Sequence, residues 1–104
     1  MMERIDKLRE FLKESPDDGF LNHALALEYV KLGQIDMARE AFERLLSNDP
    51  DYVGSYYHLA KLLESTGQVE TALKWYEKGI ETARRVGDRH ALGELQAAYD
   101  DLAD

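Results

Sequence analysis

The sequence repeats itself at an interval of thirty-four residues across its central part. Small and large apolar residues, glycines and acidic residues all recur at this spacing. The matched positions are Leu25-Ala26 and Leu59-Ala60, Gly33-Gln34 and Gly67-Gln68, Ala38 and Ala72, and Glu43 and Glu77. Repeats of this kind cannot bury their apolar faces alone, so neighbouring copies stack on one another. The sequence therefore predicts a repeat protein.

The segments between these landmarks are predicted to be helices, because apolar residues recur at spacings of three and four and no alternating strand pattern is present. Helix ends are expected at Pro16, Gly33, Pro50, Gly67 and Gly87, since proline and a C-terminal glycine stop a helix. The expected helices are 19–32, 35–48, 53–66 and 69–86, with one helix before them and one after. The predicted fold class is all-α, an α-solenoid of about six helices in antiparallel pairs.

Charge and composition restrict the partners of this chain of 104 residues. Twenty-one acidic residues against thirteen basic ones give a net charge of -8, which opposes binding to nucleic acid. No cysteine is present, and the N-terminal segment has no apolar run of the length that a signal peptide or a membrane span needs. We therefore expect a soluble, complete, cytoplasmic chain with no nucleic-acid and no membrane partner.

Residue patterns typical of catalysis or metal binding are not found in the sequence. His23, His58 and His90 form no HxxxH or HxxE pair. The carboxylates fall at salt-bridge spacing on helix faces, as Glu40 and Arg44 do. We predict no enzyme activity, no cofactor and no metal. For Trp75, packing in the helical stripe is favoured over a role as a ligand anchor, and the basic residues from Arg84 to His90 are expected to be a solvated helix end.

The typed positions of the repeat resemble the tetratricopeptide repeat family. In a first copy beginning at Gly19 they are Leu25, Ala26, Tyr29, Gly33, Ala38, Phe42 and Pro50, and in a second copy Tyr56, Leu59, Ala60, Leu63, Gly67, Ala72, Tyr76 and Gly79. The second copy departs from the pattern in having Leu63 where a tyrosine is usual, and in lacking the final proline. The resemblance implies a right-handed superhelix in a single domain: half-repeat 1–18, repeats 19–52 and 53–86, and capping helix 87–104.

In the family that this chain resembles, the first helix of each repeat lines a concave groove that binds peptides or helices. The matching positions are Phe20, His23, Leu27 and Val30, then Gly54, Tyr57, Lys61 and Glu64, then Asp88, Ala91, Leu95 and Ala98. The candidate protein-binding residues among them are Phe20, His23, Leu27, Val30, Tyr57, Lys61, Glu64 and Leu95. The resemblance implies a protein or peptide partner and a non-catalytic scaffold function.

Some members of that family hold the carboxylate of a chaperone tail with lysine, asparagine and arginine. The matching positions here carry His23, Leu27, Lys61, Ala91 and Leu95, so this clamp is absent and hydrophobic anchoring of the partner is expected. Two alternatives stay open. Phe20 or Leu27 could pack on the N-terminal helix, and the groove could be filled by a second copy in a homodimer.

Overall fold

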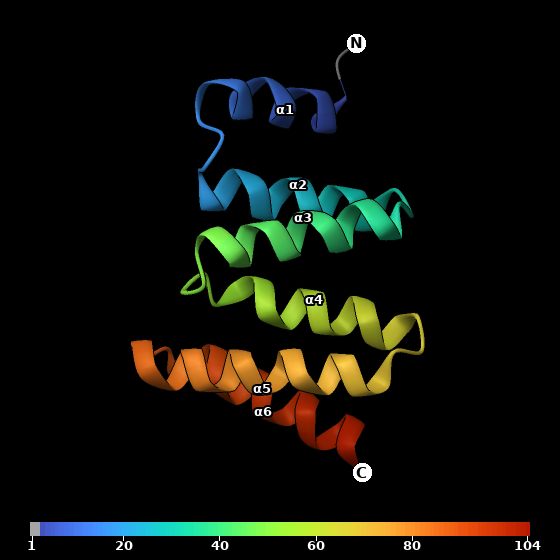
Figure 1. The fold of residues 1–104 in the computed structure, drawn as a ribbon, viewed down its shortest axis with the longest axis vertical. Coiled ribbons are helices and arrows are strands. Elements are labelled where there is room, and N and C mark those ends of the chain that lie inside the picture. The colour runs from blue at the N-terminus through green and yellow to red at the C-terminus, as the bar shows by residue number, and fades with distance from the viewer. Residues whose placement is uncertain (1–2) are drawn as a thin grey trace. The chain divides into compact units, whose positions relative to one another are not determined.

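Six helices make up residues 3–104, the part of the chain that the computed structural model describes (Figure 1). They are α1 (Arg4–Glu14), α2 (Gly19–Lys31), α3 (Ile35–Asn48), α4 (Gly54–Ser65), α5 (Val69–Val86) and α6 (Arg89–Ala103). The described residues form no strand. The prediction of an all-α fold with six helices is confirmed, and the four helices with predicted limits begin and end within about one residue of them.

The helices end where glycine and proline were expected to stop them. Gly33, Gly67 and Gly87 follow α2, α4 and α5 with φ of 75°, 79° and 79°, which is the left-handed region that favours glycine. After α2, the Gln34 amide donates to the Tyr29 carbonyl at 2.9 Å, and this bond satisfies an otherwise unpaired carbonyl of the last turn. These turns reverse the chain so that α2 and α3, and α4 and α5, form antiparallel pairs (Figure 1).

Aspartates begin two of the helices. The carboxylate of Asp18 accepts the Leu21 amide at 2.9 Å at the start of α2, and Asp88 accepts the Ala91 amide at 3.0 Å at the start of α6. Each bond satisfies one of the free N–H groups of a first turn. Asp18 is thus the residue, of the two aspartates after Pro16, that caps α2.

The described chain divides into two compact units, with unit 1 ending at Asp49 and unit 2 beginning at Pro50. Unit 1 contains α1, α2 and α3, and unit 2 contains α4, α5 and α6. The division falls next to the proline that ends the first full copy of the repeat.

In unit 1, α2 packs against both α1 and α3. Ala26, Ala38 and Phe42 are fully buried, and the two alanines permit close contact between the helices. On the side of α1, the Arg9 guanidinium donates to the Tyr29 hydroxyl at 2.8 Å and lies 5.7 Å from the centre of the same ring. A single arginine therefore combines a hydrogen bond and a cation–π contact to fix α1 on α2.

In unit 2, α5 packs against both α4 and α6, and the three helices meet at Gly79. A Cβ atom placed on Gly79 would lie 2.7 Å from the Cβ of Tyr56 and 3.0 Å from a methyl group of Leu95. Real Cβ atoms essentially never approach so closely, so a side chain at this position would force its neighbours to shift. The hydroxyl of Tyr56 also donates to the Pro50 carbonyl at 2.6 Å, which holds the start of the unit against its first helix.

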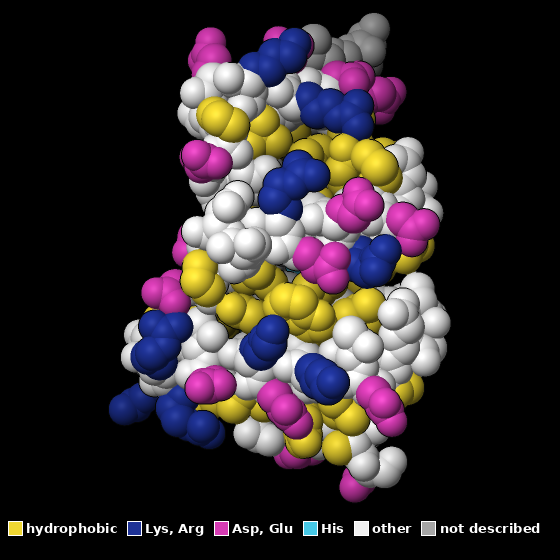
Figure 2. Space-filling model, viewed as in Figure 1, with side chains coloured by type: hydrophobic (Ala, Val, Ile, Leu, Met, Phe, Trp, Pro, Cys, Tyr) yellow, Lys and Arg dark blue, Asp and Glu magenta, His cyan; other side chains and the backbone are white. Residues whose placement is uncertain are grey.

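Charged and hydrophobic side chains are distributed differently over α4 and α5. On the face seen in Figure 2, lysine, arginine, aspartate and glutamate side chains are interspersed along α5, while hydrophobic side chains gather over α4. α5 is amphipathic, with Ala72, Tyr76 and Ala83 fully buried on one side. The second helix of this repeat therefore presents a solvated face to water.

We expect Gly79→Ala to lower the free energy of unfolding by about 1–3 kcal/mol, because the added methyl group overpacks the contact with Tyr56. Gly93→Ala is the matched control. Gly93 also lies inside a helix, but a Cβ there would meet nothing within 4 Å. Alanine should stabilise that position by about 0.4–1 kcal/mol. Urea unfolding of both variants measures the difference, and equal stabilities would contradict the close contact at Gly79.

Candidate functional site

The predicted binding residues of unit 1 share one stripe of α2, which we call the α2 face: Phe20, His23, Leu27 and Val30. Their spacings of three and four residues place them on one side of a helix over about 15 Å. Phe20 is 69% exposed and Val30 is 37% exposed, while His23 and Leu27 are half-buried. Phe20 is therefore not covered by α1, which removes for this residue the alternative that it packs on the N-terminal helix.

His23 connects the α2 face to the core of unit 1. Its ring meets the buried ring of Phe42 edge-on, with centroids 5.8 Å apart and an angle of 62° between the planes. This is a favourable arrangement for two aromatic rings. His23 thus packs against the core beneath the α2 face, and Phe20 and Val30 are the apolar residues of this face that are accessible to a partner.

The predicted binding residues of α4 are Tyr57, Lys61 and Glu64, which we call the α4 face. The Lys61 ammonium lies 3.7 Å from the Glu64 carboxylate and 5.7 Å from the centre of the Tyr57 ring. Glu64 also accepts a hydrogen bond from the hydroxyl of Tyr76 at 2.7 Å. The two opposite charges of this face are therefore paired with each other and held by neighbouring aromatic residues.

Tyr76 is fully buried as a residue, so its hydroxyl depends on Glu64 as an acceptor. Its burial, and next the hydrogen bond to Glu64, raise the pKa of the Tyr76 hydroxyl above the ordinary value of 10.0. The ring also meets Tyr57 edge-on, with centroids 6.4 Å apart and an angle of 62°. Tyr57 and Tyr76 thus repeat, thirty-four residues later, the contact between His23 and Phe42.

The two faces differ in chemistry at equivalent positions of the repeat. Where unit 2 has the buried hydroxyl of Tyr76 and its acceptor Glu64, unit 1 has Phe42 and Val30, neither of which has a polar side-chain atom. Lys61 likewise replaces Leu27. The α2 face is consequently apolar, and the α4 face is polar but internally neutralised.

Leu95, which the repeat pattern predicts to be a groove residue, lies in a buried contact between α6 and α5. Leu95 is only 1% exposed, and its methyl groups pack at Gly79. Ala98, the next groove position on α6, is 8% exposed, and Asp88 caps its own helix. Within the third set of groove positions, Leu95 therefore belongs to the contact of α6 with α5, whereas Asp88 is exposed and Ala91 is half-buried.

One interaction was missed by the sequence reasoning, which assigned the Arg84-to-His90 segment to a solvated helix end. Arg85 donates to the Asp51 carboxylate at 2.6 Å. This hydrogen bond holds the pKa of Asp51 below its usual range. Asp51 and Arg85 are thirty-four residues apart and so occupy the same position of successive repeats. Opposite charges at equivalent positions could have predicted this ion pair from the sequence.

Residues 3–104 contain neither a cluster of potential metal ligands nor a helix that could span a membrane. Within residues 3–104, no group of three or more histidine, aspartate or glutamate side chains is arranged to hold a metal ion. None of the helices described above combines the length and the apolar character that crossing a membrane requires.

Replacing Glu64 by valine should cost about 1–3 kcal/mol, since the Tyr76 hydroxyl then stays buried without its acceptor. The double variant Glu64→Val/Tyr76→Phe reproduces the Val30 and Phe42 of the preceding repeat and should cost less than the sum of the two single changes, with a coupling of about 0.5–3 kcal/mol. Urea unfolding of the three variants gives the coupling energy. Strict additivity would show that the hydrogen bond does not stabilise the fold.

Tyr76 also makes the stability of unit 2 depend on pH in the alkaline range. Since the folded state raises the pKa of Tyr76, the unfolded state releases this proton first, and stability is lost as pH rises above 10.0. Between about pH 8 and pH 11, the wild type should therefore lose more free energy of unfolding than Tyr76→Phe does. Parallel loss in both proteins would assign the alkaline effect to other tyrosines.

Known proteins resemble this chain along most of its length. A family model described as tetratricopeptide repeat matches residues 23–86. A TPR repeat-containing protein of Pseudomonas aeruginosa is 29% identical over 91 residues, which cover 88% of this chain and 87% of that protein. A tetratricopeptide repeat domain protein of Salinibacter ruber, solved by NMR, is 44% identical with a TM-score of 0.81, covering 84% of this chain and 88% of that one.

The fold is also similar to that of more distant domains. The TPR2B domain of yeast Sti1, solved in complex with pHsp70, has a TM-score of 0.87 at 18% identity, covering 95% of this chain and 79% of that one. Folds of this type generally mediate protein–protein interactions and are typically non-catalytic. Because the family model matches more than half of its residues, the chain belongs to the tetratricopeptide repeat family.

Proposed function

We propose that this protein is a non-catalytic interaction module whose α2 face holds an apolar anchor of a partner peptide or helix. The observation that carries the proposal is the 69% exposure of Phe20, a large aromatic side chain at the start of that face. An exposed apolar patch of this kind is typical of an interface. The proposed compartment is the cytoplasm, which suits a sequence without cysteine.

The α2 face specifies the chemistry of the anchor. Phe20, Leu27 and Val30 offer apolar surface over about 15 Å, the length of roughly three helical turns or of four to five extended residues. A partner that presents two or three apolar side chains over this distance would cover it. The yeast Sti1 domain, which shares the fold and was solved in complex with pHsp70, supports a protein partner in general.

The α4 face contributes a different kind of contact to the proposed site. Lys61 and Glu64 neutralise each other, so this face would offer a partner the Tyr57 ring and a paired set of polar groups. An isolated charge on the partner would gain little from such a pair, because each of the two charges already has its counter-charge. The preferred ligand would therefore combine an apolar anchor for α2 with an uncharged polar segment for α4.

The test compares Phe20→Ala with the matched control Phe11→Ala. Peptides selected from a displayed library on the wild-type protein are measured by titration calorimetry. Phe20→Ala should weaken their binding by more than about 1 kcal/mol, since binding energy concentrates in a few buried anchors. Phe11 lies on α1 and is 59% exposed, so its truncation removes a similar side chain outside the α2 face. Equal affinities for the two variants would place binding elsewhere.

A homodimer is the second candidate, because the same exposed apolar residues could be covered by another copy. Sedimentation equilibrium over a range of concentrations separates the two possibilities. A monomer at all concentrations removes the homodimer, whereas a dimer that Leu27→Asp dissociates would show that the α2 face is already occupied.

A further inference from the structure

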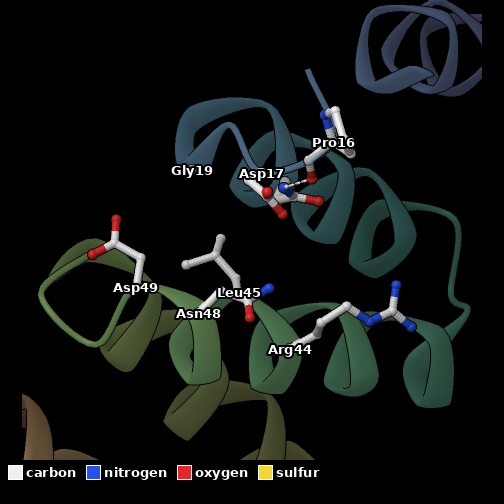
Figure 3. A pocket seen from close by; sticks show the side chains of 8 residues that line it. Pro16, Asp17, Gly19, Arg44, Leu45, Asn48 and Asp49 are labelled. Atoms are coloured by element: carbon white, nitrogen blue, oxygen red, sulfur yellow. Dashed lines mark hydrogen bonds between the residues drawn. The ribbon is translucent and has the colours of Figure 1, made fainter. Parts of the chain in front are cut away.

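A pocket of about 240 Å³ lies in unit 1, between the loop that follows α1 and the C-terminal end of α3 (Figure 3). Pro16 and Asp17 line it from the loop, Gly19 and Asn22 from the first turn of α2, and Leu45 from α3. In Figure 3 the Leu45 side chain points from α3 toward the segment of Pro16 and Asp17. None of these residues belongs to the α2 face.

Unit 2 has larger side chains at two of the equivalent positions. Thirty-four residues after Gly19 and Asn22 stand Val53 and Tyr56, which are 8% and 5% exposed. The Tyr56 hydroxyl donates to the Pro50 carbonyl at 2.6 Å, and the Asn22 amide donates to the equivalent carbonyl of Pro16 at 3.0 Å, the bond dashed in Figure 3. Asn22 thus makes the hydrogen bond that Tyr56 makes, but without an aromatic ring.

On the opposite wall of the pocket, Leu45 of α3 fills only part of the space that the Tyr56 ring occupies in unit 2. Leu45 stands at the position of Gly79, where unit 2 leaves no room for a side chain because of Tyr56. Even with the leucine present, the space of about 240 Å³ persists. This volume exceeds that of an enclosed apolar cavity of about 150 Å³ that binds benzene in another protein, but the pocket here is open to solvent and is also lined by Arg44 and Asn48. Its volume is sufficient for a single aromatic ring.

We propose that this pocket receives one tyrosine or tryptophan side chain of a partner protein, in the place that Tyr56 occupies in unit 2. The ring would pack on Pro16 and on the small accessible part of Leu45, which is 4% exposed. The carboxylates of Asp17 and Asp49, which also line the pocket, provide acceptors for a phenol O–H or an indole N–H. This inference rests on the proposed protein-binding function but uses residues outside the α2 face.

The test is an NMR titration of the ¹⁵N-labelled full chain with p-cresol and with N-acetyl-tyrosine amide. Both should shift the amide signals of Gly19, Asn22 and Leu45 in a saturable way, with a dissociation constant on the order of 1 mM. The amides of Val53 and Tyr56 are the internal control, because their equivalent space is already filled. No saturable shift, or equal shifts at the control positions, would overturn the proposal. Binding of p-cresol alone would also do so, since it would indicate a small-molecule site.

Variants of Asn22 distinguish a specific ring site from a surface hollow. Asn22→Tyr should abolish p-cresol binding by placing a ring in the pocket, and Gly19→Val, which copies Val53, is a second blocking change should the first variant fold poorly. Asn22→Ala frees the Pro16 carbonyl for the phenol hydroxyl and should tighten p-cresol binding about three- to tenfold. The affinity for 4-methylanisole, which has no hydroxyl group, should not increase in the Asn22→Ala variant. Unchanged p-cresol affinity in the blocking variants would refute the site, whatever the outcome at the α2 face.

Discussion

Close contact between paired helices is the constraint on which the rest of the structure depends. Ala38 in unit 1, and Ala72 and Gly79 in unit 2, have little or no side chain at positions where helices cross, and all three are buried. Larger neighbours such as Phe42 and Tyr76 then fill the space beside each crossing. Because the contact leaves no spare volume, any change at a small position has to be matched by its neighbours.

Matched changes of this kind explain how two copies of one repeat have acquired different surfaces. Unit 2 has Tyr76 and Glu64 where unit 1 has Phe42 and Val30, so a polar pair takes the place of an apolar pair, and the buried hydroxyl of Tyr76 has Glu64 as its acceptor. In the same way, unit 2 has Tyr56 and Gly79 where unit 1 has Asn22 and Leu45. The two copies share the same backbone fold, but the polarity of each exposed face depends on the buried residue that packs beneath it.

The fold was predictable because its determinants are local. The ends of α2 and α4 follow from Gly33 and Gly67, which have positive φ and which the sequence already indicates as helix ends because they are glycines.

The candidate site was predictable only in outline. Leu95 was placed in the groove by its repeat position, but it is covered because its side chain packs at Gly79 of α5, a contact between helices that the repeat spacing does not specify. The pairing of Lys61 with Glu64 depends on side-chain directions that spacing alone does not specify.

The single tryptophan of the chain gives its two halves different spectroscopic signals. Trp75 lies in unit 2, tilted against Tyr56 at a centroid distance of 6.0 Å and with the Lys78 ammonium 4.6 Å from the centre of its ring. Its fluorescence therefore reports the melting of α4 and α5, while the helical ellipticity reports the helices of both units. A difference between the fluorescence and circular dichroism transitions of this protein would be a direct measure of the cooperativity between neighbouring repeats.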